Sequence, residues 1–261
     1  PIHVSPYGSR GVSTEDRSLA GPRREIGAFH NRKNLVDRDS LVDKFAFHGR
    51  ISKLRPSNGE RPRYPRGPDA MRNVLITGGA GFIGSHLAET LLQRGCAVQV
   101  IDDLSTGCEQ NIAHLRQNPA FSFVRDTVIH REVTTELVAQ ADMVFHLAAA
   151  VGVHLIIEQP VRTIKTNIAC TEIILELCAQ RRTPVLLAST SEVYGKLQRE
   201  KLREDGDVVL GPTSRSGGGC DSSKIIDEVL AKDYYNEQGL PAVVARFFNT
   251  IGPRQTGRYG M

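Results

Sequence analysis

The stretch VLITGGAGFIGSHLAETLLQRGCAVQVIDDLSTG, residues 74–107, decides the fold of this chain. It begins with a short β-branched apolar run and turns at a cluster of glycines. It then continues with spaced leucines (Leu87, Leu91 and Leu92) and ends in a second apolar run before Asp102. Apolar runs bounded by turns predict buried strands, and spaced leucines predict an amphipathic helix. We therefore expect strand, turn, helix and strand, the beginning of a parallel α/β sheet.

The glycines of this turn predict a phosphate-binding site. Gly78 permits a tight turn, Gly81 lets a pyrophosphate approach the backbone, and Gly84 lets the helix pack closely on the strand. The helix N-terminus adds free N–H groups and the positive end of its dipole, both of which favour an anion. The Asp102 carboxylate can bind both ribose hydroxyls of adenosine and would repel a 2′-phosphate, which favours NAD over NADP. A glycine-rich turn in another kind of α/β protein is the alternative.

The positive charge of the chain is concentrated at its start. The formal net charge of the whole chain is +4. Residues 1–70 alone carry +6, from 14 Lys and Arg against 8 Asp and Glu. This segment lacks a sustained hydrophobic period, and Met71 stands directly before the first expected strand. We predict a largely disordered leader or an artefact over 1–70. Residues 71–261 are predicted to form an NAD-binding domain with the start of a substrate-binding region.

Composition also indicates the broad class of the protein. No stretch approaches the roughly 20 apolar residues that span a bilayer, and the first residues lack a compact apolar core like that of a secretory signal, so we expect a cytoplasmic protein without membrane contact. The basic leader lacks interleaved aromatic residues, so we expect no nucleic-acid partner. We also predict no metal, because the five cysteines show no metal-ligand spacing and the histidines are scattered. These cysteines are Cys96, Cys108, Cys170, Cys178 and Cys220.

The spacing Gly-x-x-Gly-x-x-Gly resembles that of the short-chain dehydrogenase/reductase superfamily. The words TGGAGFIGSHL and IDDLSTG resemble its extended branch, the NAD-dependent nucleotide-sugar epimerases, dehydratases and decarboxylases, and the resemblance covers about residues 71–261. It implies a Rossmann-type, doubly wound parallel α/β sheet, with the C-terminal substrate domain largely missing from this sequence. It also implies a homodimer through helices at 160–181 and 221–238, and a nucleotide-sugar substrate.

The resemblance further implies a set of cofactor-binding residues. Asp126, after a strand at 121–124, would contact the adenine amino group, or is only a turn residue at a strand end. Small residues after a strand at 143–150 would leave space beside the cofactor. The full set is Gly78, Gly81, Phe82, Ile83, Gly84, Asp102, Asp103, Leu104, Thr106, Asp126, Leu147, Ala148, Ala149, Asn167, Lys224 and Phe247.

Two further words imply contacts with the substrate. In STSEVYG, residues 189–195, Thr190 would hydrogen-bond the reacting sugar hydroxyl, and Glu192 matches the acid of dehydratases and decarboxylases or is a solvated side chain. In FFNTIGPR, residues 247–254, Asn249 and Arg254 would meet the sugar nucleotide, although Arg254 can also be read as a loop cation.

The catalytic word of the resembled family has a defect here. The family pairs a Tyr with a Lys four residues later, because i and i+4 share a helix face, and the phenolate removes a sugar hydroxyl proton. Lys224 is present, but Cys220 stands in the Tyr position within SGGGCDSSK, and its thiol is too short to replace a phenol except through water. We expect the helix to begin near Asp221 and to bury Ile225, Ile226, Val229 and Leu230.

The function predicted from these words is that of an NAD-dependent epimerase or dehydratase that oxidises a nucleotide-linked sugar at C4. Cys220 would impair or abolish its turnover, with Thr190, Glu192 and Lys224 as the surviving catalytic group. The alternatives are a UDP-glucuronate decarboxylase, a non-catalytic NAD or sugar-nucleotide-binding protein, and a reductase with a non-sugar substrate. A local reading-frame slip is another explanation of SGGGCDSSK.

Overall fold

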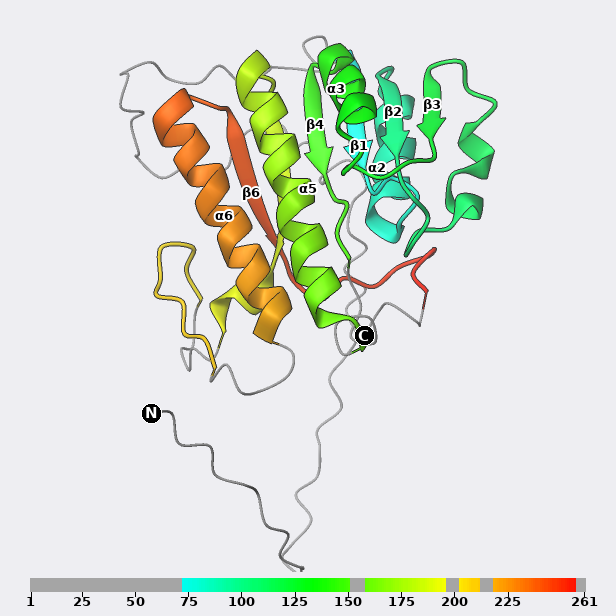
Figure 1. Ribbon diagram of the computed structural model, residues 1–261. Coiled ribbons are helices and arrows are strands. Elements are labelled where there is room, and N and C mark those ends of the chain that lie inside the picture. The colour runs from blue at the N-terminus through cyan, green and yellow to red at the C-terminus, as the bar shows by residue number, and fades with distance from the viewer. Residues whose placement is uncertain (1–71, 151–157, 196–201, 212–217, 257–261) are drawn as a thin grey trace, which may run out of the picture. The chain divides into compact units, whose positions relative to one another are not determined.

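A computed structural model describes residues 72–150, 158–195, 202–211 and 218–256, with the backbone alone for 218–221. The predicted leader at 1–70 lies outside these ranges. In the described part, six strands form one parallel sheet in the order β3-β2-β1-β4-β5-β6 (Figure 1). They are β1 (Asn73–Thr77), β2 (Ala97–Ile101), β3 (Phe121–Val124), β4 (Met143–His146), β5 (Val185–Thr190) and β6 (Ala242–Phe247).

This strand order confirms the predicted doubly wound sheet. From β1 the chain first moves outward through β2 and β3, and then returns to the other side of β1 with β4. Thr77 at the end of β1 is aligned with Ile101 of β2 on one side and His146 of β4 on the other. The order therefore reverses at β1, and ligands of such sheets bind at this switch point, outside the carboxyl ends of the strands.

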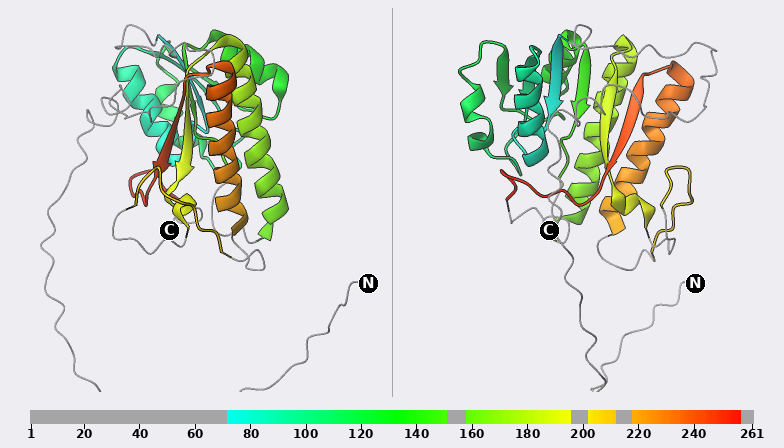
Figure 2. Two further views of the ribbon diagram at one scale, coloured as in Figure 1. Left: turned by 90° about the vertical axis from the view of Figure 1, so that its left-hand side faces the viewer. Right: turned by 180° about the vertical axis from the view of Figure 1, so that it is seen from behind.

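Helices cover both faces of the sheet. They are α2 (Phe82–Gln93), α3 (Arg131–Gln140), α5 (Pro160–Arg181) and α6 (Gly218–Gln238), with the 3₁₀ turns η2 (Glu109–Asn111), η3 (Ala113–Leu115) and η4 (Ser191–Tyr194). Helices α3, α5 and α6 lie on one face, and α2 lies on the other (Figures 1 and 2).

Alternation along the strands builds a separate core on each face. In β1, Leu75 packs into the cluster with α3, α5 and α6, whereas Val74 and Ile76 pack with α2. All three side chains are fully buried. Burying an aliphatic side chain of this size contributes about 1.5–3 kcal/mol, so β1 is anchored from both faces and holds the following turn in place.

Between β2 and β3 the chain forms two single 3₁₀ turns, η2 and η3, and the Asn111 side-chain amide donates to the Ala80 carbonyl. The strand expected at 143–150 ends at His146. The Leu147 amide still donates to the Thr77 carbonyl, but the chain then leaves the sheet. The small residues at 148–150 follow beside the switch point.

The buried face of α6 was predicted only in part, since Leu230 packs against the core but two other expected residues are exposed. The helix begins at Gly218 rather than near Asp221, and two of the expected buried residues, Ile226 and Val229, are 43% and 51% exposed. The buried positions are instead Ser223, Lys224, Asp227 and Ala231. Because α6 packs along α5, whose buried face is itself polar near Asn167 and Thr171, charged side chains point inward here.

Candidate cofactor and reaction site

The glycine turn between β1 and α2 is shaped by close backbone contacts. Gly78 has φ +73°, and a Cβ there would lie 2.7 Å from the Ala148 nitrogen. A Cβ on Gly84 would overlap the Gly78 carbonyl oxygen, so α2 packs onto the turn through this position. By contrast, a Cβ on Gly81 would meet only that carbonyl oxygen, at 3.2 Å. Gly78 and Gly84 are therefore required by packing, and Gly81 leaves open space at the helix start.

The N-terminus of α2 is arranged to receive an anion. Its N-cap is Gly81, which provides no side-chain acceptor, and the first turn contains no acidic residue. The first N–H groups of a helix have no partner within the helix, and together with the dipole they favour negative charge. A pyrophosphate therefore fits the chemistry of this turn, where Phe82 and Ile83 are the first helical residues.

Asp102 joins the end of β2 to the glycine turn. It is 8% exposed, and its two carboxylate oxygens accept hydrogen bonds from the backbone amides of Ala80 and Leu104, each at 2.9 Å. Burial raises the pKa of Asp102, and these two amides act in the opposite direction. A carboxylate has about four acceptor positions, so two remain for ribose hydroxyls.

The neighbouring candidate residues lie in the turns after β2 and β3. Asp103 is exposed, and its carboxylate accepts from the Ser105 amide at 2.9 Å, while Thr106 is half-buried. Asp126 accepts from the Thr127 amide and contacts the His130 ring nitrogen at 2.9 Å. The His130 contact is the largest cause that lowers the pKa of Asp126 below its ordinary value.

The segment after β4 is fixed by Asn167 on α5. Asn167 is 1% exposed, and its Oδ1 accepts from the Ala150 amide at 2.7 Å while its Nδ2 donates to the Ala150 carbonyl at 3.5 Å. The predicted cofactor-lining residues Leu147, Ala148 and Ala149 therefore lie between two anchored points, Thr77 and Asn167. Asn167 acts on the backbone of this segment rather than presenting a free amide.

The predicted reaction residues on β5 lie at its carboxyl end, as expected. Thr190 caps η4, where its Oγ1 accepts from the Glu192 amide at 3.2 Å, and the Glu192 side chain is exposed. Behind them, Arg246 of β6 forms a bidentate ion pair with Glu228 of α6, with contacts of 2.7 and 3.0 Å. The Arg246 guanidinium also stacks over the Tyr194 ring, 4.7 Å from its centroid. This ion pair ties β6, α6 and η4 together.

Lys224 is buried and already paired. It is 6% exposed, and its Nζ donates to Asp227 Oδ2 at 3.1 Å within α6. Cys220 lies one turn earlier along the same helix, and its side chain lies outside the described part of the structure. An ammonium has three donors, so two of those of Lys224 are not used by Asp227.

The segment after β6 packs on α2. Phe247 is half-buried, while Asn249 is exposed. Arg254, with φ +68°, donates from Nη2 to Glu89 Oε2 of α2 at 2.7 Å. The His86 ring nitrogen lies 3.1 Å from the Pro253 carbonyl. The guanidinium predicted to bind the sugar nucleotide therefore forms an ion pair that holds this segment to α2.

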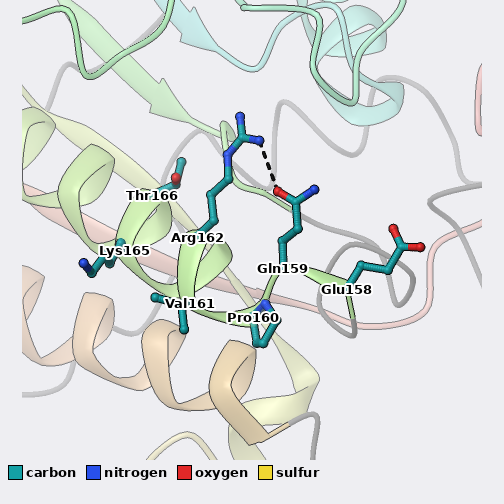
Figure 3. A pocket seen from close by; sticks show the side chains of 7 residues that line it. All are labelled: Glu158, Gln159, Pro160, Val161, Arg162, Lys165 and Thr166. Carbon is teal, nitrogen blue, oxygen red and sulfur yellow. Dashed lines mark hydrogen bonds between the residues drawn. The ribbon is translucent and has the colours of Figure 1, made fainter.

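A hollow of about 550 Å³ lies at the start of α5, apart from the glycine turn (Figure 3). It is lined by Glu158, Gln159, Pro160, Val161, Arg162, Lys165 and Thr166. In it, the Arg162 guanidinium donates to the Gln159 side chain at 3.1 Å.

In the described ranges, no helix is long and apolar enough to cross a membrane. The same ranges contain no group of three or more His, Cys, Asp and Glu placed to hold a metal.

Sequence reasoning missed a group of buried polar residues beside Lys224. Thr77, His146, Thr171 and Asp227 are each no more than 1% exposed, and they come from β1, β4, α5 and α6. One available signal was the row of polar residues four apart on α5, at 163, 167 and 171, which marks a polar helix face directed inward.

A parallel sheet with a glycine turn at its switch point and a buried acidic residue after the neighbouring strand defines a dinucleotide-binding protein of the Rossmann type. The chain matches the family model described as GDP-mannose 4,6 dehydratase over residues 75–260, and it belongs to that family. The resemblance to the extended branch of the short-chain dehydrogenases/reductases is thereby confirmed.

Curated relatives agree with this family. The chain is 40% identical over 183 residues to a UDP-N-acetyl-alpha-D-glucosaminuronate decarboxylase of Bacillus cytotoxicus, covering 70% of this chain and 56% of that protein. It is 37% identical over 198 residues to UDP-glucuronic acid decarboxylase 1 of Arabidopsis thaliana, covering 75% and 44%. The chain thus spans about half the length of the curated relatives it matches.

Solved structures give the same picture. A UDP-N-acetylglucosamine 4-epimerase from Methanobrevibacter ruminantium is 28% identical with a TM-score of 0.65, covering 71% of this chain and 57% of that one. The NAD complex of a UDP-glucose 4-epimerase from Thermus thermophilus is 32% identical with a TM-score of 0.60, covering 70% and 57%. The prediction of NAD as the cofactor of this family is confirmed by such complexes.

Proposed function

We propose that the chain binds NAD across the switch point, with the pyrophosphate at the N-terminus of α2 and the adenosine ribose at Asp102. The observation that carries this proposal is the pairing of an uncapped helix start with a buried carboxylate that is hydrogen-bonded to the same turn. The residues present fit the cofactor, since Gly81 leaves room for an anion and Asp102 keeps acceptor positions.

We further propose that the chain is part of an enzyme that oxidises a nucleotide-linked sugar at C4, as the first step of epimerisation or dehydration. Bound NAD would accept the hydride. Thr190 would hydrogen-bond the reacting hydroxyl, and the exposed Glu192 would act as an acid or base at the sugar. Lys224 would provide a fixed positive charge beside them. The family membership and the location of Thr190 and Glu192 at the carboxyl end of β5 support these roles.

Turnover by this chain is proposed to be strongly reduced. A phenol oxygen reaches several ångströms farther than a thiol, so Cys220 can contact a sugar hydroxyl only through water. The backbone of α6 supports the assignment of Cys220 to the position of the family's Tyr, because residue 220 lies one turn before Lys224, the spacing that the Tyr and Lys require.

Two alternatives rest on specific observations. The decarboxylases among the relatives, together with Glu192, favour a UDP-glucuronate decarboxylase. Cys220 favours a protein that binds NAD and a sugar nucleotide without catalysis.

In each case we propose a homodimer through α5 and α6, because Val161, Ile226 and Val229 expose apolar surface on these two helices.

The test compares the unmodified chain with Cys220→Tyr and Cys220→Phe, using UDP-glucose and UDP-glucuronate with NAD. Product analysis is expected to show turnover about 100-fold higher in Cys220→Tyr, the lower limit of what a general base contributes, and no gain in Cys220→Phe. The Phe variant supplies the ring without the hydroxyl and is the matched control. Sugar-nucleotide binding without turnover in all three proteins would favour the non-catalytic alternative. Full turnover by the unmodified chain would overturn the proposed defect.

A further inference from the structure

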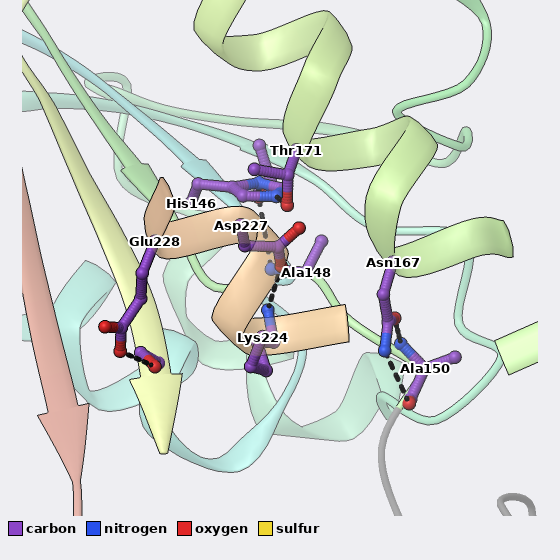
Figure 4. A network of polar contacts seen from close by, with 10 residues as sticks. His146, Ala148, Ala150, Asn167, Thr171, Lys224, Asp227 and Glu228 are labelled. Atoms are coloured by element: carbon purple, nitrogen blue, oxygen red, sulfur yellow. Dashed lines mark hydrogen bonds and ion pairs between the residues drawn. The ribbon is translucent and has the colours of Figure 1, made fainter. Parts of the chain in front are cut away.

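The buried polar residues around Lys224 connect α6 to the glycine turn. Figure 4 shows His146, Thr171, Asp227 and Lys224 pointing toward one another between the sheet and the two long helices. Of these, Asp227 is fully buried and contacts Lys224 directly. A buried carboxylate or ammonium is unfavourable unless it is paired, so each of these two charges requires the other.

The connection continues from α5 to β1. His146 Nε2 lies 3.4 Å from Thr171 Oγ1, and His146 Nδ1 lies 2.7 Å from Thr77 Oγ1. Thr77 Oγ1 also accepts a hydrogen bond from the Ala148 amide at 3.1 Å. Thr77 is the last residue of β1, directly before Gly78, so the series of contacts ends at the glycine turn.

The Thr171 hydroxyl also acts on the Asp227 carboxylate. Burial raises the pKa of Asp227, while Lys224 and the Thr171 hydroxyl act in the opposite direction. Asp227 Oδ1 nevertheless has no partner within strict hydrogen-bond geometry among the described residues. A hydroxyl lowers the pKa of a carboxylate as a donor, so the Thr171 hydroxyl proton is directed at Asp227.

The direction of the Thr171 hydroxyl proton decides which nitrogen of the His146 ring carries a hydrogen. Burial lowers the pKa of His146 to about 3, so its ring is neutral and carries one N–H. If the Thr171 hydroxyl proton is directed at Asp227, then Thr171 must accept from His146 Nε2–H. His146 Nδ1 is then the acceptor for the Thr77 hydroxyl.

We propose that Asp227 is a positioning residue for Lys224, and that Thr171, His146 and Thr77 join this ion pair to the cofactor turn. Asp227 fixes one donor of the Lys224 ammonium and directs the other two toward the carboxyl edge of the sheet. This inference rests on the proposed function, with Lys224 also facing bound NAD as the family resemblance implies. NAD affinity then depends on a carboxylate that does not touch NAD.

The remaining groups around the pair do not replace Asp227. Cys170 of α5 stays a neutral thiol, because burial raises its pKa to about 11. Glu228 of α6 is held by Arg246, and Asp103 is exposed beyond the end of β2. With His146 neutral, the only carboxylate in direct contact with Lys224 among the described residues is Asp227.

The test measures NAD binding by calorimetry at about pH 6.5 and 8.5 for the unmodified chain, Asp227→Asn and Thr171→Val. An unpaired buried ammonium loses its proton more readily, so affinity of Asp227→Asn is expected to fall about ten-fold or more at the higher pH and less at the lower. Thr171→Val is expected to weaken binding about three-fold. Thr163→Val is the matched control, because Thr163 is on the same helix, 1% exposed, and its hydroxyl has no partner in the described structure.

An unchanged affinity and pH dependence in Asp227→Asn would overturn the proposal. If that variant fails to fold, ¹⁵N NMR of histidine in the unmodified chain decides, with the His146 signal assigned as the one that moves in Thr171→Val and not in Thr163→Val. A neutral ring protonated at Nε2 from about pH 6 to 8 supports the connection, and one protonated at Nδ1 contradicts it. Failure of the unmodified chain to bind NAD would refute the proposed function instead, and the NMR result would still decide the connection.

Discussion

The carboxylate of Asp102 accepts a hydrogen bond from the backbone amide of Ala80, 22 residues earlier in the chain. This contact ties the end of β2 to the glycine turn after β1, and a second contact holds the Leu104 amide in the next turn. One buried carboxylate thus shapes both segments that a dinucleotide would touch.

Asp102→Asn is expected to weaken both the fold and NAD binding. An amide keeps one acceptor oxygen, so one of the two buried amides loses its partner, and the free energy of unfolding falls by about 1–3 kcal/mol. The dissociation constant for NAD is expected to rise about ten-fold or more, because a good ribose acceptor is lost. Urea denaturation and calorimetry measure the two effects. The exposed Asp233→Asn is the control, and equal behaviour of both variants would contradict the role of Asp102.

Two glycine substitutions separate packing from binding. Gly84→Ala places a Cβ against Gly78 and Gly79 backbone atoms, and is expected to lower the free energy of unfolding by about 1–3 kcal/mol. Gly81→Ala meets only one atom at 3.2 Å and is expected to fold nearly normally, but to bind NAD about ten-fold more weakly, since its methyl lies at the helix start. Denaturation curves and calorimetry check this. A Gly81→Ala chain that binds NAD normally would place the pyrophosphate elsewhere.

His146 is expected to make stability depend on pH. Its ring has a pKa of about 3 in the folded chain and an ordinary value of 6.5, so unfolding takes up a proton between these values. Stability is therefore fully present above about pH 6.5 and is lost as the pH falls, by at most about 1.4 kcal/mol per pH unit.

The measurement is the free energy of unfolding at about pH 7 and pH 5 for the unmodified chain and His146→Gln. The variant is expected to be less stable at pH 7 and to show a shallower decline. Parallel slopes for the unmodified chain and His146→Gln would show that His146 is not held neutral.

The ion pair between Arg254 and Glu89 is expected to stabilise the segment after β6 modestly. The two side chains are 23% and 29% exposed, so their coupling in a double-mutant cycle should be about 0.5–1 kcal/mol. The cycle uses Arg254→Ala and Glu89→Gln, with the exposed pair Arg203 and Asp205 as a control whose coupling should be near zero.

The same ion pair predicts a pH effect. The Arg254 hydrogen bond is the largest cause that lowers the pKa of Glu89 below its ordinary 4.5. The stabilisation is therefore present above about pH 4.5 and is lost as the pH falls through the lower value in the folded chain. Coupling that persists unchanged in strong acid would show that the Glu89 charge is not involved.

Local sequence predicted the parts of this fold whose signals are contiguous. The glycine turn, Asp102 and the bounds of α5 follow from short words, and α5 begins with Pro160 at its first turn, where proline is favoured. The strand expected at 121–124 is confirmed as β3, whereas the one expected at 143–150 ends at His146, because strand ends depend on pairing with neighbours such as Thr77.

The face of α6 could not be predicted in this way. Hydrophobic periodicity directs Ile226 and Val229 inward, yet in the structure both are exposed and Lys224 and Asp227 are buried. Their buried charges are paired with each other along α6, and Thr171 of α5 also acts on the Asp227 carboxylate. The residues that connect Lys224 to the glycine turn come from strands and helices far apart in sequence, so no short sequence motif contains them.

The central claim, that NAD lies across the switch point with its ribose at Asp102, is tested most directly by calorimetry of NAD and NADP on the unmodified chain. We expect one NAD bound per chain, and NADP bound about ten-fold more weakly or not at all, because the Asp102 carboxylate repels a 2′-phosphate. No heat of binding with NAD, or equal affinity for the two cofactors, would contradict the account.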